Sequence, residues 1–249
     1  MSKQRKARKQ NQPRKGNRES IDKNSQQREE SYTPPVMSAS SSIQAKNEAQ
    51  GQYMSQIENK DIIFGVGPAG TGKTYVPARM AAQELREGRI DKVVIVRPMI
   101  GCDEDMGHLP GDLEEKFHPW LEPFFDALEE ELGTGFLQYC LKSKKIEAKP
   151  LQFMRGKSFK NCWILLDEAQ NTTTDQMKMF VTRIGADCKM IISGDITQHD
   201  RKRYRGDPMK NGLEDAVQRL ESVSRIGVAR FDSDDIVRHH LIGEILSKY

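Results

Sequence analysis

Residues 61–74 read DIIFGVGPAGTGKT, a short apolar run followed by a glycine-rich turn that ends in Lys73 and Thr74. The turn has the spacing G-x-x-x-x-G-K-[ST] of a phosphate loop, in which backbone N–H groups converge on the phosphates of a nucleotide. Lys73 can reach the β and γ oxygens, and Thr74 would open a helix whose positive dipole end faces the anion. The sequence therefore predicts a site for a nucleoside triphosphate. The predicted contacts in this loop are Gly67, Pro68, Ala69, Gly70, Thr71, Gly72, Lys73 and Thr74.

Apolar runs rich in β-branched residues recur after this first one, at residues 93–96, 163–166, 190–192 and 226–231. Continuous apolar strands are typical of a sheet that is buried on both faces. Between them, residues 74–86 and 174–183 have apolar side chains at helical spacing, and the second stretch follows a threonine-rich cap. Alternating strands and helices predict an α/β fold with a doubly wound, mostly parallel sheet.

Two adjacent carboxylates, Asp167 and Glu168, directly follow the apolar run at residues 163–166. Ligands of doubly wound sheets bind beyond the carboxyl ends of the strands. The phosphate loop, this pair, Arg97-Pro98 and Ser193-Gly194-Asp195 all follow apolar runs, so we expect four loops to build one site there. Asp167 would hold Mg²⁺ together with the Thr74 hydroxyl, and Glu168 would orient or deprotonate the attacking water. An Asp-Glu pair is also common at a solvated strand end, but its position after an apolar strand favours magnesium-dependent hydrolysis of a nucleoside triphosphate.

The N-terminal segment differs in composition from the rest. Residues 1–18 hold eight basic side chains and no acidic one, whereas the whole chain has a formal net charge of +3. The first forty-odd residues are polar and lack an apolar period, so burial cannot offset their ordering entropy. We expect residues 1–42 to be a disordered basic tail and residues 43–249 to be the folded domain. The tail could attract nucleic acid through its charge or serve only as a solvated arm.

Several classes of protein are disfavoured by composition. No apolar run follows the basic start, as a secretory signal would require, and no stretch is apolar enough to span a bilayer, so we expect a cytoplasmic protein with no membrane partner. The four cysteines, Cys102, Cys140, Cys162 and Cys188, are widely spaced, which favours reduced thiols over a metal site. Cys162 lies in a strand-like run and is expected to be an ordinary buried thiol.

At this point the chain resembles the PhoH family of RecA-like ATPases, which share motifs with superfamily-one helicases. The resemblance implies a three-layer RecA-like P-loop fold and an ATPase that uses ATP and Mg²⁺, is linked to RNA and acts as or like an RNA helicase. It also implies a homo-oligomer such as a hexameric ring. The similar segments are GVGPAGTGKT (65–74), VRPMIGCDEDMGHLPGDLEEKFHPWLEPFFDAL (96–128), PLQFMRGKSFKNCWILLDEAQNTTTDQMKMFVTRIG (150–185), SGDITQHD (193–200) and DIVRHHLIGEILSKY (235–249).

The resemblance assigns roles to further residues. Gln198 would sense the γ-phosphate, although its surroundings could equally be a simple Gly-Asp turn. Gln50 is similar to the glutamine with which such ATPases read adenine, or it is a polar residue without a role. A chain with room for one RecA-like half would need an arginine from a neighbouring subunit to complete its ATP site. Arg238 is the first candidate, and the competitors are Arg183, Arg201 and Arg203.

Single-stranded RNA is the expected partner. Its candidate contacts are Arg97, Arg155, Lys157 and Lys160, expected in loops beside the nucleotide site, with Phe153 and Phe159 as stacking surfaces or as core residues. The spacing of Phe117, Trp120, Phe124 and Leu128 fits a buried helical stripe, either core or subunit contact.

Two features depart from the family pattern, and two other functions stay open. Pro77 falls inside the helix after the loop and is expected to distort its first turns, and the basic tail lies outside the family core. The alternatives to an RNA-directed ATPase are a P-loop phosphotransferase, for which no lid or acceptor pocket is evident, and a nucleic-acid-binding module in which ATP only controls assembly.

Overall fold

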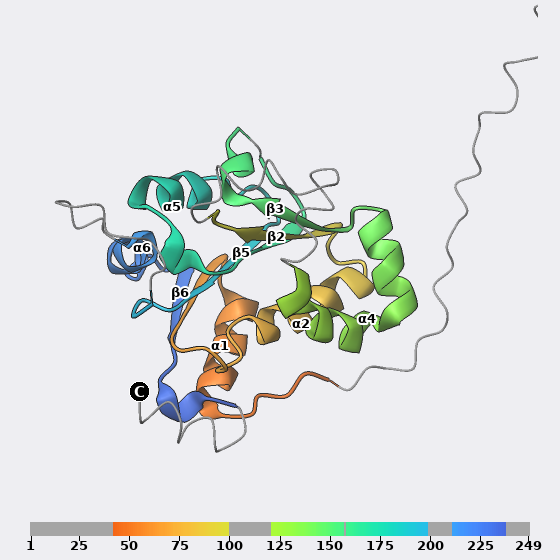
Figure 1. Ribbon diagram of the computed structural model, residues 1–249, viewed down its shortest axis with the longest axis horizontal. Helices are drawn as coiled ribbons and strands as arrows, with labels where there is room; N and C mark the ends of the chain where they lie inside the picture. Colours follow the sequence, from red (N-terminus) through yellow and green to blue (C-terminus); the bar gives the residue numbers. More distant parts are fainter. Residues whose placement is uncertain (1–41, 100–120, 157, 199–210, 238–249) are drawn as a thin grey trace, which may run out of the picture. The chain divides into compact units, whose positions relative to one another are not determined.

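The computed structural model describes residues 42–99, 121–156, 158–198 and 211–237 (Figure 1). Several residues predicted from the sequence to matter lie outside these ranges. They are the basic tail apart from its last residue, Cys102, Phe117, Trp120, Lys157, Arg201, Arg203 and Arg238.

Within the described residues, six strands form one sheet in which every neighbouring pair is parallel (Figure 1). The spatial order is β3-β2-β4-β5-β1-β6, so β1 and β4 lie inside the sheet and are buried along their whole length. This burial explains their uninterrupted apolar sequences and confirms the predicted doubly wound sheet. The strands are β1 (Ile62–Val66), β2 (Lys92–Arg97), β3 (Ile146–Pro150), β4 (Cys162–Leu166), β5 (Lys189–Gly194) and β6 (Ile226–Arg230).

Helices cover both faces of the sheet (Figure 1). α1 (Glu48–Asn59), α2 (Tyr75–Arg86) and α4 (Glu122–Lys142) lie on one face, and α5 (Thr174–Val181) and α6 (Gly212–Leu220) lie on the other. Each face has its own apolar core, one containing Tyr53 and Leu128 and the other containing Phe64 and Phe180. This is the predicted three-layer arrangement. None of the described helices has the length and apolar character needed to cross a membrane.

α6 was not expected from the sequence, and neither were β3 and α1. β3 has the sequence IEAKP and is an edge strand that pairs only with β2. Polar side chains are tolerated at such an edge, and Glu147 forms an ion pair with Lys92 at 3.2 Å. α1 buries only three residues, Gln50, Tyr53 and Ile57, and it begins where the Asn47 side chain accepts the N–H of Gln50. Neither β3 nor α1 has a long apolar pattern.

The predicted helices agree with the structure except at their ends. α5 ends at Val181, two residues before the predicted end, and begins with a capping box formed by Thr173 and Gln176. Of the predicted buried stripe, Phe124 and Leu128 lie on α4 and are buried in the core beside α2. The expected distortion at Pro77 is confined to one missing hydrogen bond. α2 runs unbroken from Tyr75 to Arg86 with Pro77 in its first turn, and the Lys73 carbonyl has no N–H four positions later to accept.

Candidate nucleotide-binding site

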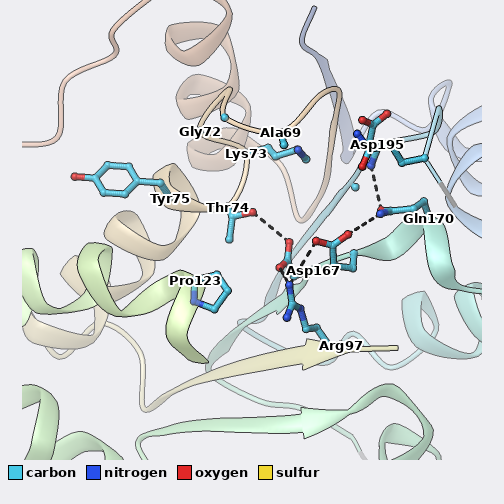
Figure 2. Close-up of a pocket in the computed structure, with 14 residues that line it drawn as sticks. Ala69, Gly72, Lys73, Thr74, Tyr75, Arg97, Pro123, Asp167, Gln170 and Asp195 are labelled. Carbon is cyan, nitrogen blue, oxygen red and sulfur yellow. Dashed lines mark hydrogen bonds and ion pairs between the residues drawn. The ribbon is translucent and has the colours of Figure 1, made fainter. Parts of the chain in front are cut away.

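The carboxyl ends of β1, β2, β4 and β5 meet at a cavity of about 370 Å³ (Figure 2). Predicted site residues that line the cavity are Ala69, Gly70, Gly72, Lys73, Thr74, Asp167, Glu168 and Gln198. Arg97, Gly194 and Asp195, expected at this edge from their positions at strand ends, also line it. The lining residues that were not expected from the sequence are Tyr75, Pro123 and Gln170. The phosphate loop and the carboxylate pair therefore belong to one site, although 93 positions separate Thr74 from Asp167.

Thr74 and Asp167 form the centre of this site. The Thr74 hydroxyl donates to Asp167 Oδ1 at 3.1 Å, from the N-cap of α2 to the end of β4. Asp167 is 5 % exposed, and burial raises the pKa of its carboxyl, an effect that Arg97 and the Thr74 hydrogen bond oppose. One hydroxyl and one carboxylate suit Mg²⁺ that arrives with a nucleotide, because such sites leave most of the coordination to phosphates and water. Among the described residues, no group of three or more His, Cys, Asp or Glu could hold a metal.

Arg97 faces the two carboxylates from the end of β2 (Figure 2). Its guanidinium lies 3.1 Å from Asp167 Oδ2 and 3.4 Å from Glu168 Oε1. The sequence placed Arg97 in a loop that contacts RNA, but β2 lies beside β4 with Val96 paired to Leu166, so the next residue of each strand meets at the cavity. Its charge compensates the carboxylate pair in the absence of a cation.

Glu168 is tied to the end of β5 through Gln170. Gln170 Nε2 donates to Glu168 Oε2 at 2.6 Å, while Gln170 Oε1 accepts the Asp195 N–H at 3.1 Å (Figure 2). Gly194 allows this approach, since a Cβ there would lie 2.7 Å from Gln170 Oε1. The carboxylate predicted to orient water is therefore held by a neutral amide. This link from Glu168 through Gln170 to β5 could not be predicted from the sequence, in which Glu168 and Gln170 are only two positions apart.

Asp195 is a buried carboxylate at the same edge. Its Oδ1 accepts the N–H of Thr197 at 2.9 Å and the Thr197 hydroxyl at 2.7 Å. Its Oδ2 is buried and has no hydrogen-bond partner among the described residues. The Asp195 carbonyl accepts the Gln198 N–H at 3.2 Å, which closes a tight turn. This turn brings the exposed Gln198 side chain to the cavity, where a sensor of the γ-phosphate would have to lie.

The rest of the loop forms the wall behind the cavity. The Lys73 ammonium donates to the Pro68 carbonyl at 2.8 Å, and the Thr71 hydroxyl donates to the same carbonyl at 3.1 Å. The Gly67 N–H bonds to the Gly194 carbonyl at 3.1 Å and joins the loop to β5. Gly67, Pro68 and Thr71 thus shape the loop without lining the cavity.

Gln50 lies behind the loop, on α1. It is 4 % exposed, its Oε1 accepts the Lys46 N–H at 3.0 Å, and its Nε2 donates to the Thr71 carbonyl at 2.9 Å. Gly72 has a φ of +92°, and a Cβ there would lie 2.7 Å from Gln50 Nε2, so only glycine fits this contact. Both ends of the Gln50 amide are engaged by backbone, and adenine reading, which stays a prediction, would require it to release them.

The candidate RNA contacts lie at two opposite edges of the sheet. Lys160 lies at the edge opposite the cavity, since β4 begins at Cys162 and the intervening Asn161 N–H bonds to the Ala186 carbonyl ahead of β5. The expectation that Lys160 and its neighbour Phe159 flank the nucleotide site is therefore wrong. Phe153 and Arg155 follow the carboxyl end of β3 on the cavity edge, where Phe153 is 45 % exposed in the 3₁₀ turn η3 (Leu151–Met154).

Comparison with known proteins gives a consistent family relationship. The family model described as PhoH-like protein matches residues 42–249. The chain is 44 % identical over 211 residues to Protein PhoH of Escherichia coli (strain K12), covering 84 % of this chain and 58 % of that protein. It is 41 % identical over 208 residues to a PhoH-like protein of Bacillus subtilis (strain 168), covering 84 % of this chain and 64 % of that protein. A PhoH-like protein of Mycobacterium tuberculosis (strain ATCC 25618 / H37Rv) is 40 % identical over 207 residues, 83 % of this chain and 58 % of its own length.

Proposed function

The chain belongs to the PhoH-like protein family, and from this membership and the geometry of its cavity we propose that it is an ATP-binding, Mg²⁺-dependent ATP hydrolase that acts on RNA. One observation carries the hydrolase proposal. The Thr74 hydroxyl and the Asp167 carboxylate meet at 3.1 Å in the cavity that Lys73 and Glu168 also line. Hydroxyl, carboxylate, ammonium and a second carboxylate are the groups that metal-assisted phosphoryl transfer to water requires.

The residues of the cavity divide the work of this reaction. Lys73 would exchange the Pro68 carbonyl for the β and γ oxygens of ATP, and Thr74 and Asp167 would hold the Mg²⁺. The bound Mg²⁺ would neutralise charge on the phosphates. Glu168, fixed by Gln170, would orient water and accept its proton. Arg97 offsets the charge of both carboxylates before the cation binds.

The test is ATP turnover at saturating Mg²⁺, with and without single-stranded RNA, by the unaltered chain and by Glu168→Gln. We expect Glu168→Gln to bind ATP but to turn it over about 10²- to 10⁴-fold more slowly, as for loss of a general base. Absence of hydrolysis by the folded, unaltered chain in both conditions would refute the enzyme. Hydrolysis that RNA neither stimulates nor inhibits would leave the ATPase and refute the RNA link.

The proposal extends to a ring of subunits and to an RNA partner. The chain spans 58 % of the length of the E. coli relative, so activities of the whole relatives are proposals here. Phe153 and Arg155, exposed on the cavity edge, are the described residues best placed to meet a strand of RNA. We propose that the chain acts as a ring-forming, helicase-like or translocase-like ATPase in which a neighbouring subunit supplies an arginine such as Arg238. The mass of the particle with ATP bound tests this, because a monomer would have no donor in trans.

A further inference from the structure

The series of i→i+4 hydrogen bonds that leads into α2 lacks one member, just before the N-cap residue Thr74. In a regular helix the Lys73 carbonyl would accept the N–H of the residue four positions later. That residue is Pro77, which has no N–H to donate. The bonds on either side are formed, from Val76 N–H to the Gly72 carbonyl at 2.9 Å and from Ala78 N–H to the Thr74 carbonyl at 3.3 Å.

Two side-chain hydroxyls take the place of the missing donor. Ser193, at the end of β5, donates to the Lys73 carbonyl at 2.8 Å, and Tyr53, on α1, donates to it at 3.2 Å. A carbonyl oxygen has two lone pairs, so these bonds fill its capacity. The Lys73 carbonyl is thus held by two elements that belong to different parts of the sequence.

Tyr53 is built into this position. Its side chain is fully buried, and its ring packs edge-on against Phe231 with the centroids 5.4 Å apart. Gly65 in β1 leaves room for the hydroxyl, since a Cβ at that position would lie 2.7 Å from the Tyr53 oxygen. Burial raises the pKa of Tyr53 well above its ordinary value, so the hydroxyl stays protonated and remains a donor.

The orientation of this carbonyl matters for the cavity. In a planar trans peptide the carbonyl and the following N–H point in opposite directions. Because Tyr53 and Ser193 hold the Lys73 carbonyl from the side of the core, the Thr74 N–H is turned away from them, and Thr74 lines the cavity. Backbone N–H groups at this point of a phosphate loop are the donors that cradle phosphate oxygens.

We propose that Tyr53 and Ser193 are positioning residues of the phosphate loop, whose hydroxyls replace the helical donor that Pro77 lacks and so aim the Thr74 N–H at the nucleotide. This inference rests on the proposed nucleotide-binding function and deepens it. Since Ser193 directly precedes Gly194 and Asp195 of the cavity wall, the same bond joins β5 to the loop.

The experiment restores the missing donor and asks whether the hydroxyls become dispensable. Tyr53→Phe and Ser193→Ala are combined in the natural chain and again in a chain carrying Pro77→Ala, and ADP affinity is measured by calorimetry. In the natural chain we expect the pair to weaken ADP binding by about tenfold, the effect of two hydrogen bonds. With Pro77→Ala we expect the same pair to cost about twofold or less, because the new N–H can hold the carbonyl.

Ser143→Ala is the matched control. It removes a serine hydroxyl that donates to a main-chain carbonyl, that of Tyr139, at 2.7 Å at the end of α4, and Ser143 does not line the cavity. ADP affinity should not change in this variant. An equal loss from the hydroxyl pair with and without Pro77→Ala would overturn the inference, since the hydroxyls would then act independently of the helical donor.

The same set of variants, unfolded in denaturant without nucleotide, separates this inference from the proposed function. We expect the hydroxyl pair to lower the denaturation midpoint more in the natural chain than in the Pro77→Ala chain. If the unaltered chain binds no ADP but shows this difference, the proposed function fails while the hydroxyls still replace the helical donor. If it binds ADP and neither readout shows a difference, the inference fails and the function stands.

Discussion

The Gln170 side chain orients Glu168 and links it to the end of β5. Its amide donates to the Glu168 carboxylate and accepts the Asp195 N–H. One neutral amide thus fixes the Glu168 side chain, which is 44 % exposed. Glu168 also has a φ of +55°, in the left-handed region that few non-glycine residues adopt. The orientation of Glu168 toward the cavity therefore depends on Gln170 and, through it, on the backbone at the end of β5.

Replacing Gln170 by alanine should separate orientation from binding. We expect Gln170→Ala to lower kcat for ATP by about tenfold, since a well-placed general base contributes more than this and only its positioning is lost. The KM for ATP should change little, because Gln170 contacts no part of the phosphate loop in the described hydrogen bonds. Gln218→Ala, an exposed glutamine on α6, is the control for steady-state kinetics. An unchanged kcat in Gln170→Ala would contradict the positioning role.

Arg97 is the counter-ion of a carboxylate pair. Without it, Asp167 and Glu168 would face each other in the free protein without a cation, so we expect Arg97→Ala to lower the free energy of unfolding by about 2 kcal/mol, less than for a fully buried pair because the arginine is partly exposed. Chemical denaturation without nucleotide measures this. Arg225→Ala, which breaks an exposed pair with Asp61, should have a clearly smaller effect, and equal effects would show that Arg97 is not a counter-ion.

The buried thiols should be chemically inert in the folded protein. Burial, and then a contact with Cys188 at 3.6 Å, raises the pKa of Cys162 to about 12, and burial raises that of Cys140 to about 11. At pH 7.5 both are therefore protonated, and the thiolate that reacts with iodoacetamide is scarce. Peptide mass spectrometry should find both unmodified until denaturant is added. Rapid alkylation of Cys162 in the folded chain would contradict its burial.

Among the strands and helices, the interior strands could be predicted from sequence, whereas an edge strand and a helix with few buried residues could not. β1 and β4 have long apolar runs because both their faces are covered, and this is why their positions could be predicted. β3 could not, because an edge strand with one neighbour tolerates Glu147, Lys149 and Pro150. α1 buries only three side chains, two of them polar or amphipathic, and so lacks the periodicity that reveals a helix.

The packing of α1 on β1 makes a test of this layer. The Tyr53 ring lies so close to Gly65 that a Cβ would have no space there. We therefore expect Gly65→Ala to lower the free energy of unfolding by about 2 kcal/mol, the usual cost of overpacking a core. Gly51→Ala is the matched control, because Gly51 lies in α1 with its nearest contact at 3.7 Å and alanine favours helix there. Thermal or chemical unfolding of both variants provides the comparison, and a neutral Gly65→Ala would contradict the close contact.

At the scale of the whole molecule, the site is assembled by strand order. The phosphate loop and the Asp167-Glu168 pair could be predicted because each is a local pattern beside an apolar strand. Arg97 and Asp195 could be expected at the same edge because each follows an apolar run. Their contacts, and the part played by Gln170, could not be predicted, because they follow from β2, β4 and β5 being neighbours in the sheet, which no local pattern encodes. Lys160 lies at the opposite edge because it precedes the amino end of β4, whereas the cavity lies at the carboxyl ends of the strands.

The family model matches residues 42–249. This match establishes the family of the chain but does not establish the reaction at the site. In the proposed ATPase, a single sheet with one phosphate loop would supply the loop, the residues that hold the metal and the carboxylate that orients water. An arginine that reaches the γ-phosphate is not found among the described residues of the cavity other than Arg97, which is engaged by Asp167 and Glu168. This is consistent with the proposal of a donor from a second subunit.

Thr74 and Asp167 are proposed to hold Mg²⁺ for a nucleotide bound by the phosphate loop. Calorimetric titration with a non-hydrolysable ATP analogue, with and without Mg²⁺, measures this in the natural chain and in Asp167→Asn. We expect Mg²⁺ to strengthen binding to the natural chain, and we expect Asp167→Asn to keep the Mg²⁺-free affinity while losing that gain. An equal gain from Mg²⁺ in both chains, or no binding of the analogue by the natural chain, would contradict the claim.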